Sequence, residues 1–424
     1  MNPRASLFAL ALYLFQLCIA KQSKLASQAS TYTNPILDGV GADPWVVHHG
    51  DSYYMTYTTH DNITILRSNT LTDWHDAETK LAFSPPPDTE YSYSLWAPEL
   101  HFFDELDRWY IIFTADVDPD HPSPIQDMLC DFTCPAVNHR MFVLESTGSD
   151  PWTSNYTFKS QLDTFDQFAI DGTYFIHSTG LYHIYSCWHD KYISWPAMLC
   201  ITRMTNPWTV SSTISERQII SRPDQPWEKT PYGRTVNDRL SSNEGPQQLT
   251  NAHTGQQFLI YSAARSDNRN YCLGQLELTG QDPMDPAAWT KFTRGCVFEE
   301  NPAAQVYGVG HASFTTSPDD KENWIIYHGM HDFEKGWDAR SIRTQHFTWN
   351  KDGSPRFPKP AVGPFAFPSG QDGTSGDGSG SAGPRAMGRR ERLGSTGLQK
   401  GLSLLDDILS EKIEWLYSKI RAGV

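Results

Sequence analysis

One strand pattern recurs five times along the chain, and this repetition limits the possible folds more than any other feature. Each copy is a run of five residues rich in aromatic and β-branched side chains, as a half-buried strand requires. The copies are Tyr53–Tyr57, Trp109–Phe113, Leu181–Tyr185, Gln257–Tyr261 and Asn323–Tyr327. Further strand candidates and a tryptophan-bearing turn follow several of them. Five units of about four strands predict an all-β, five-bladed β-propeller, and a β-sandwich with coincidental aromatic runs is the alternative.

An ionisable residue opens the first strand of each unit. These residues lie 11 to 14 positions before the aligned aromatic, and they are Asp43, Glu99, Asp171, Glu244 and His311. Because the innermost strands of a propeller line its central channel, we expect all five on a ring around the channel mouth. Crowded carboxylates raise one another's pKa, so such a ring is costly unless function uses it. The non-functional alternative is that acidic residues simply cap the strand starts.

The five strand openings together resemble glycoside hydrolase family 43, the five-bladed inverting glycosidases. Within that family the resemblance is greatest to extracellular, exo-acting α-L-arabinofuranosidases, and it covers roughly residues 34 to 368. The matching segments are Ala42–Trp45, Leu95–Glu99, Ile170–Thr173, Asn243–Pro246 and Gly310–His311.

The resemblance implies roles for individual residues. Asp43 matches the family's general base, Glu244 its general acid, and Asp171 the third carboxylate, which orients the acid and tunes its pKa. His311 matches an axial histidine that often supports a calcium ion or a water cluster. Arg340 matches an arginine of the last blade that contacts substrate.

The chemistry of glycoside cleavage agrees with these residue types. Inversion needs one protonated carboxyl at the leaving oxygen and one ionised carboxylate that activates water on the opposite side. Trp96 is predicted to stack on a sugar face, with packing between blades as the alternative. Glu99 is interpreted as structural. His328 and His331 are interpreted as surface-loop or substrate-lining residues rather than a metal pair.

The predicted function is the release of terminal α-L-arabinofuranosyl residues from plant cell-wall polysaccharide or oligosaccharide. A β-xylosidase, an endo-arabinanase and a catalytically inactive sugar-binding propeller are the alternatives. The chemistry needs no cofactor, and the resemblance allows a structural calcium on the propeller axis, held near His311 through waters. With 49 acidic and 34 basic residues and a net charge of −15, the chain lacks the basic surface that nucleic acids or anionic membranes require.

The first twenty residues are typical of a secretory signal peptide, with a basic start, a short apolar run and small residues at its end. We therefore expect a secreted protein with no stable membrane anchor. Six cysteines remain after removal of this segment, and we expect the sequence-local disulfides Cys130–Cys134, Cys187–Cys200 and Cys272–Cys296. Asn62 and Asn155 begin glycosylation sequons.

The predicted organisation is a propeller domain over residues 31–368, followed by two further segments. Residues 369–396 form a flexible linker, rich first in Gly and Ser and then in basic residues. Residues 397–421 carry apolar residues every three or four positions, which predicts a short amphipathic helix. The family resemblance gives this helix no role, and nothing in the sequence indicates an oligomeric state.

Overall fold

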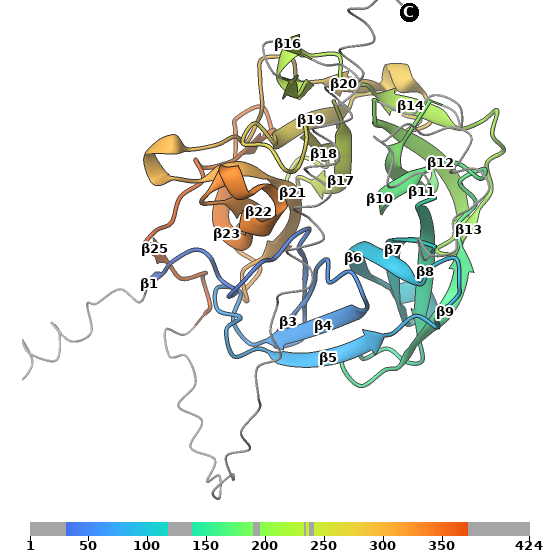
Figure 1. Ribbon diagram of the computed structural model, residues 1–424, viewed down its shortest axis with the longest axis horizontal. Helices are drawn as coiled ribbons and strands as arrows, with labels where there is room; N and C mark the ends of the chain where they lie inside the picture. The colour runs from blue at the N-terminus through green and yellow to red at the C-terminus, as the bar shows by residue number, and fades with distance from the viewer. Residues whose placement is uncertain (1–30, 118–137, 190–195, 233–234, 237–240, 372–424) are drawn as a thin grey trace, which may run out of the picture. The chain divides into compact units, whose positions relative to one another are not determined.

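The structure, a computed structural model, describes residues 31–117, 138–189, 196–232, 235–236 and 241–371. These residues form five antiparallel sheets, each with its strands in sequence order, arranged around a central axis (Figure 1). The predicted all-β, five-bladed propeller is confirmed. The signal peptide, the Cys130–Cys134 pair and the helix at 397–421 lie outside the described residues. So does all of the predicted linker beyond Gln371.

The blades follow one another along the chain. Blade 1 consists of β2 (Trp45–His49), β3 (Ser52–Thr56), β4 (Ile63–Ser68) and β5 (Glu78–Phe83). Blade 2 consists of β6 (Tyr93–Phe103), β7 (Arg108–Asp116), β8 (Arg140–Ser146) and β9 (Tyr156–Gln161). Blade 3 consists of β10 (Ala169–His177), β11 (Gly180–Cys187), β12 (Met198–Asn206) and β13 (Thr209–Val210), and β14 (Gln218–Ser221) also pairs with β12.

Blade 4 consists of β17 (Asn243–Thr250), β18 (Gln257–Ala263), β19 (Cys272–Leu278) and β20 (Trp289–Lys291). Blade 5 consists of β21 (Tyr307–Thr316), β22 (Asn323–Met330), β23 (Arg340–Trp349) and β24 (Pro355–Arg356). A small hairpin joins β15 (Pro231–Tyr232) to β16 (Thr235–Val236). The recurrent strand pattern of the sequence corresponds to the second strand of each blade.

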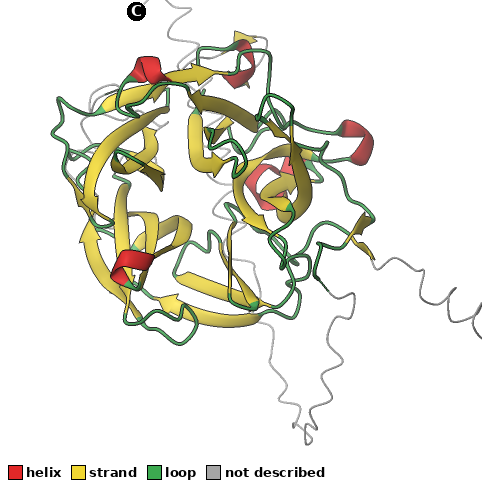
Figure 2. Cartoon of the chain, turned by 180° about the vertical axis from the view of Figure 1, so that it is seen from behind, coloured by secondary structure: helices red, strands yellow, loops and turns green. Residues whose placement is uncertain are grey.

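The described helices are short 3₁₀ turns in the connections between strands, where Figure 2 shows them in red. They are η1 (Asp104–Leu106), η2 (Pro226–Glu228), η4 (Pro286–Ala288), η5 (Pro302–Ala304) and η6 (Phe333–Ala339). In the part of the chain that the structure describes, no helix is long and apolar enough to cross a membrane.

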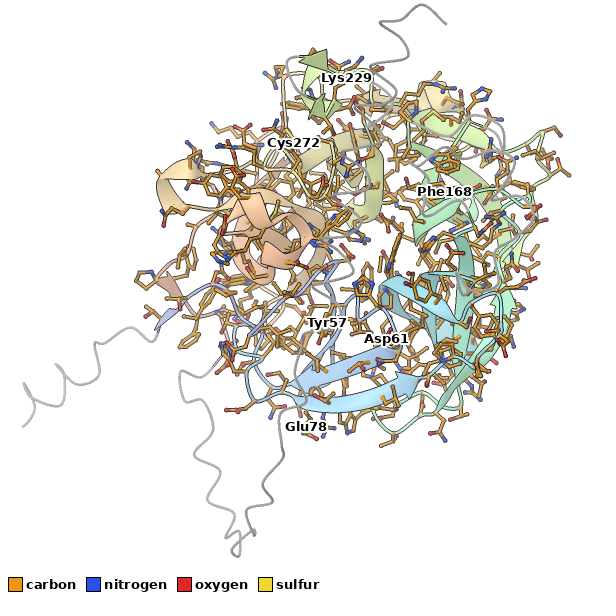
Figure 3. All side chains as sticks on the ribbon, in the orientation of Figure 1. Tyr57, Asp61, Glu78, Phe168, Lys229 and Cys272 are labelled. Atoms are coloured by element: carbon orange, nitrogen blue, oxygen red, sulfur yellow. A yellow bond between two sulfur atoms is a disulfide. The ribbon has the colours of Figure 1, made fainter. Side chains whose placement is uncertain are left out.

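The hydrophobic core is divided among the five gaps between neighbouring blades, and each of its five clusters joins two blades. Strand β7 shows how this works: Ile111 and Phe113 pack toward blade 1, whereas Tyr110 and Ile112 pack toward blade 3. Successive side chains of a strand point to opposite faces, so a strand buried on both faces is apolar throughout. Side chains fill these gaps in Figure 3, while Glu78 lies at the outer margin on β5.

The segment before blade 1 closes the ring by pairing with blade 5. Strand β1 (Thr31–Tyr32) pairs with β25 (Phe365–Ala366), and the amide of Ile36 donates to the carbonyl of Ile342 on β23. The amide of Gly41 then donates to the carbonyl of Arg340. This closure brings the first residue of β23 beside the start of blade 1.

Two of the three predicted disulfides are present. Cys187–Cys200 links β11 to β12, and Cys272–Cys296 links β19 to the segment that follows blade 4's last strand. Of the two sequon asparagines, Asn155 is exposed just before β9, whereas Asn62 is half-buried and accepts a hydrogen bond from Thr64 Oγ1 at 2.8 Å. Glycosylation at either position stays a prediction.

Candidate active site

One backbone irregularity repeats where the inner strand of every blade meets the axis. In blades 2 to 5, a two-residue bulge interrupts the ladder between the inner strand and its neighbour, and in blade 1 the bulge directly precedes the inner strand. The first residue of each bulge has a φ between 44° and 56°. These first residues are Asp43, Ala97, Asp171, Gly245 and His311. A positive φ in a residue other than glycine costs roughly 1–3 kcal/mol, and bulges of this kind re-aim side chains near functional sites.

Side chains at the end of the second strand of the preceding blade, or just after it in blade 1, accept hydrogen bonds from four of these amides. The acceptor–amide pairs are Thr58–Ala97 (2.8 Å), Thr114–Asp171 (3.0 Å), Ser262–His311 (2.7 Å) and His328–Asp43 (3.2 Å). The acceptor occupies the same place in each blade, opposite the residue that precedes the bulge. Three hydroxyls and one imidazole therefore hold the ring in its strained conformation.

The positions of the bulges differ in two blades from the ring of ionisable residues predicted from the sequence. Asp43, Asp171 and His311 occupy it as predicted, but Ala97 takes the place assigned to Glu99, and Glu244 lies one residue before the ring. Glu99 is two residues further along β6, 3% exposed, where its carboxylate pairs with His101 at 2.8 Å and accepts a bond from Gln247 of blade 4. Glu99 therefore links blade 2 to blade 4 across the channel through side-chain hydrogen bonds.

Three basic groups and one hydroxyl surround the Asp43 carboxylate. His311 Nδ1 and His328 Nδ1 lie 3.2 and 3.3 Å from its Oδ1, and Arg340 Nη1 lies 3.6 Å from the same oxygen. Thr58 Oγ1 donates to Oδ2 at 2.6 Å. Burial acts to raise the pKa of Asp43, but His311, His328 and Arg340 together hold it well below its usual range. Asp43 is therefore an ionised carboxylate across the ordinary pH range.

The other two carboxyl groups have the opposite tendency. Burial and then repulsion from Asp43 raise the pKa of Glu244 to about 7, against the hydrogen bond that Tyr271 Oη donates to Oε1 at 2.8 Å. Burial, followed by repulsion from Glu244 and Asp43, raises the pKa of Asp171 well above its usual range. Because Asp171 and Glu244 interact strongly, their protons belong to the pair.

The structure thus brings together the three carboxyl groups predicted from the sequence. His311 lies between two of them, since its Nδ1 is 3.2 Å from Asp43 Oδ1 and 3.9 Å from Asp171 Oδ2. The amide of Gly245, directly after Glu244, donates to the Asp171 carboxylate. One carboxyl with a lowered pKa beside two carboxyls with raised pKa values is the arrangement that acid–base catalysis requires.

Three further residues of the site escaped the sequence reasoning. Thr58 and Tyr271 belong to no recognisable motif, and only the register of the second strands could have pointed to Thr58. His328 was expected in a surface loop or along the substrate path, but it lies on β22, fully buried. Burial lowers its pKa to about 4, so the imidazole is neutral near neutral pH.

Arg340 lies at the edge of the carboxylate cluster, whereas the described contacts of the Trp96 side chain are with two histidines. The Trp96 ring stacks on His139 at 4.0 Å, and its Nε1 donates to His60 Nδ1 at 3.1 Å. It is half-buried, so packing and a role in sugar binding are both compatible with its position. Arg340 is the first residue of β23 and directs its guanidinium toward Asp43.

The residues around His311 do not form a set of metal ligands. In the described ranges, no group of three or more His, Cys, Asp or Glu side chains is arranged to hold a metal ion. A calcium ion on the axis would find one imidazole whose Nδ1 already faces two carboxylates, so water would have to supply its ligands. That calcium stays a prediction, and the mechanism below uses no step through it.

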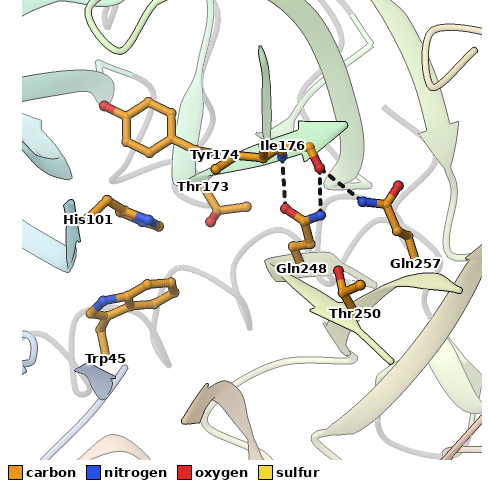
Figure 4. A pocket seen from close by; sticks show the side chains of 8 residues that line it. All are labelled: Trp45, His101, Thr173, Tyr174, Ile176, Gln248, Thr250 and Gln257. Atoms are coloured by element: carbon orange, nitrogen blue, oxygen red, sulfur yellow. Dashed lines mark hydrogen bonds between the residues drawn. The ribbon is translucent and has the colours of Figure 1, made fainter. Parts of the chain in front are cut away.

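A separate cavity of about 400 Å³ lies further along the inner strands (Figure 4). It is lined by Trp45, His101, Thr173, Tyr174, Ile176, Gln248, Thr250 and Gln257. Gln248 exchanges two hydrogen bonds of 2.8 Å with the backbone of Ile176, which ties blade 4 to blade 3 there. None of the three clustered carboxyl groups lines this cavity, so it is distinct from the candidate active site.

The sequence model of the glycosyl hydrolases family 43 matches residues 32–355 of the chain. The chain belongs to this family. It is 34% identical over 357 residues to an extracellular exo-α-(1→5)-L-arabinofuranosidase of Streptomyces avermitilis, covering 81% of this chain and 67% of that protein. It is 31% identical to α-L-arabinofuranosidase B of Pyricularia oryzae, covering 74% of this chain and 61% of that protein. The predicted enzyme class, a glycosidase, is confirmed.

Solved structures of this family have the same fold. A crystal structure of an α-L-arabinofuranosidase from Lactobacillus brevis superposes with a TM-score of 0.66 at 31% identity, covering 79% of this chain and 98% of that one. A thermostable family 43 glycoside hydrolase superposes with a TM-score of 0.61 at 21% identity, covering 80% of this chain and all of the other. The second likeness concerns the fold alone.

Proposed function

We propose that this family 43 glycosidase releases terminal α-L-arabinofuranosyl residues from plant cell-wall arabinan or from arabinose-substituted polysaccharide, with inversion at the anomeric carbon. The observation that carries the proposal is that two clustered carboxyl groups have opposite surroundings: His311, His328 and Arg340 face Asp43, whereas Tyr271 contacts Glu244. Asp43 has a pKa well below its usual range, whereas the pKa of Glu244 is raised to about 7. Relatives named as α-L-arabinofuranosidases support the choice of sugar.

Asp43 acts as the general base in this mechanism. Its ionised carboxylate removes a proton from a water molecule, and that water attacks the anomeric carbon from the side opposite the leaving group. His311, His328 and Arg340 keep the carboxylate ionised. Thr58 fixes its orientation through a 2.6 Å hydrogen bond, so the base is held in one geometry before substrate arrives.

Glu244 acts as the general acid. A carboxyl with a pKa of about 7 is protonated in mildly acidic solution and gives its proton to the glycosidic oxygen as the bond breaks. Tyr271 fixes the carboxyl by donating to Oε1. Burial is the first cause of the raised pKa, and the charge of Asp43 adds to it.

Asp171 orients the acid and shares protons with it. Its carboxyl accepts the amide of Gly245, the residue after the acid, and repulsion from Glu244, after burial, raises the pKa of Asp171. When Glu244 loses its proton to the leaving group, a protonated Asp171 limits the charge that builds up in the buried pocket. This follows from the cost of placing two like charges together away from water.

The decisive experiment offers the protein 4-nitrophenyl α-L-arabinofuranoside, 4-nitrophenyl β-D-xyloside and linear arabinan. We expect fastest turnover of the arabinofuranoside, and release of single arabinose residues from arabinan. On linear arabinan, whose leaving alkoxide needs protonation, Asp43→Asn and Glu244→Gln should each lower kcat by roughly 10²–10⁴-fold, the usual size of one proton-transfer contribution. Faster turnover of the xyloside would reassign the enzyme as a β-xylosidase, short oligosaccharides as first products would indicate endo action, and no turnover would favour a sugar-binding propeller.

We further propose that the protein is secreted and acts outside the cell. The signal-peptide pattern in residues 1–20 and two disulfides in the described residues support this. Two relatives are also named extracellular. Recovery of the processed chain from the culture medium of an expressing host tests it, and retention of the unprocessed chain inside the cell would contradict it.

A further inference from the structure

Trp337 is a large apolar side chain that the packing of the propeller leaves uncovered. It lies in η6, the connection between β22 and β23, and is 52% exposed. Every other tryptophan that the structure describes is buried or partly buried. Exposing so much aromatic surface costs free energy, and an isolated exposed aromatic beside a polar pocket is a common feature of ligand-binding sites.

The backbone of Trp337 connects directly to the carboxylate cluster. Its carbonyl accepts a hydrogen bond from Arg340 Nε at 3.2 Å, and Arg340 Nη1 lies 3.6 Å from Asp43 Oδ1. The Trp337 backbone is therefore bonded to the arginine that faces the base.

The indole ring is also anchored to the neighbouring blade. Trp337 Nε1 donates to Ser266 Oγ at 3.0 Å, in the connection between β18 and β19 of blade 4. Ser266 follows shortly after β18, the strand on which Ser262 lies directly opposite Glu244 of β17. The anchor thus belongs to the blade that holds the acid.

The rest of η6 is held in place by β21 and by the same β18–β19 connection. The Phe333 ring packs edge-on against Tyr307 with centroids 4.8 Å apart, and the Arg269 guanidinium lies 4.6 Å from the Phe333 ring centre. Gly336, with a φ of 53°, turns the chain toward Asp267. A ring fixed in this way loses little conformational freedom when a ligand packs on it.

We propose that the exposed face of Trp337 is the binding platform for the leaving-group sugar, the residue to which the terminal arabinofuranose is attached. This rests on the proposed function. A general acid must lie beside the leaving oxygen, so the leaving sugar lies on the Glu244 side of the site, and Trp337 is anchored to the same blade as Glu244. The C–H face of an uncharged sugar can pack on the uncharged, apolar face of the indole.

The test compares two substrates that differ in the leaving group alone: methyl α-L-arabinofuranoside, which offers a methyl group, and α-(1→5)-arabinotriose, which offers sugars. For Trp337→Ala, we expect the loss of kcat/KM with the trisaccharide to exceed the loss with the methyl glycoside by about tenfold, the effect of one good aromatic contact. Trp337→Phe should give an intermediate difference. Leu81→Ala on the outer strand β5, at a side chain 61% exposed, should leave the ratio of the two kcat/KM values unchanged.

Equal losses with the two substrates in both Trp337 variants would overturn the platform, because a general defect in the pocket lowers them together. Both variants are assayed well below their Tm, so partial destabilisation of Trp337→Ala does not obscure the result. Failure of the proposed function looks different: the wild-type protein would then hydrolyse neither arabinofuranoside.

Discussion

The opposite protonation of Asp43 and Glu244 arises from which charges each one faces. Asp43 lies among two imidazoles and a guanidinium, so its carboxylate is favoured despite burial. Glu244 is also withdrawn from water, but its main neighbours are the Tyr271 phenol and the Asp43 carboxylate. Environment rather than residue type therefore separates base from acid.

The raised pKa of Glu244 gives a stability prediction with a definite sign. Its folded pKa, about 7, lies above its ordinary value of 4.5, so the folded protein binds a proton that the unfolded chain releases. This contribution is complete below pH 4.5 and is lost as the pH rises through 7. In Glu244→Gln, the fall of Tm between pH 4.5 and 7 should be smaller than in the wild-type protein. Parallel curves of Tm against pH for the two proteins would contradict the raised pKa.

His328 gives a prediction for the rate. Its Nδ1 lies within reach of both the Asp43 amide and the Asp43 carboxylate, and the imidazole helps to lower the pKa of that carboxyl. In His328→Val, the Asp43 amide loses its acceptor and the carboxyl loses one of the groups that hold its pKa low. The acid limb of kcat/KM against pH should therefore move to higher pH. Ser186→Thr, at the same place in blade 3, serves as the control, and an unshifted acid limb would exclude this role.

At this scale, the sequence predicted Asp43, Asp171, Glu244, His311 and Arg340 because each belongs to a short motif. It misplaced Glu99, since the distance from bulge to aligned aromatic is 11 residues in blades 1 and 3 but 13 in blades 2, 4 and 5. Tyr271 and Thr58 could not be predicted, because a hydrogen bond between residues of different strands depends on register, which has no sequence signature of its own.

Among the elements, the bulged inner strands matter most for the site. In the bulge, Asp43, Asp171 and His311 adopt a positive φ that directs them toward the axis. A hydroxyl or imidazole of the preceding blade accepts a hydrogen bond from each of their amides. Strand positions could be read from the sequence because a strand buried on both faces is a continuous apolar run. The bulges could not, since most of the ring residues are not glycines.

Thr114→Val tests the support of the bulge. Thr114 is fully buried and accepts the Asp171 amide at 3.0 Å, so an isosteric valine leaves a buried N–H without a partner. We expect unfolding to become easier by about 1–3 kcal/mol, with reduced activity, as measured by denaturant unfolding and kinetics. Thr202→Val is the matched control: Thr202 is also fully buried, but its hydroxyl has no partner, so its loss should cost little. Equal destabilisation by the two substitutions would refute the supporting role.

For the whole molecule, the ring closes through the segment before blade 1, and the last described residues also join the propeller. Ser369 bonds to Glu322 and Asp319, and Gln371 bonds to Leu71 and Thr72. These residues were assigned to the linker from composition, which carries no information about such contacts. The propeller itself was predictable because a whole unit repeats five times.

A chain ending at Gln371 tests whether the remaining residues serve hydrolysis. It keeps every described contact of the propeller and all three carboxyl groups of the site. We expect kcat/KM on 4-nitrophenyl α-L-arabinofuranoside and on arabinan to stay within about twofold of the full chain, well under the ~1.4 kcal/mol that a tenfold change represents. A loss of more than tenfold on arabinan alone would assign residues 372–424 to polysaccharide binding.

The central claim is that Asp43 activates a water molecule directly while Glu244 protonates the leaving oxygen, each from its own blade. The anomeric configuration of the first product tests this most directly. It is observed by proton NMR during rapid hydrolysis of an α-L-arabinofuranoside, before mutarotation mixes the anomers. We predict that β-arabinofuranose appears first and that the α anomer grows in afterwards. Appearance of the α anomer first would mean a covalent intermediate and a carboxylate nucleophile, and would contradict the roles assigned to both residues.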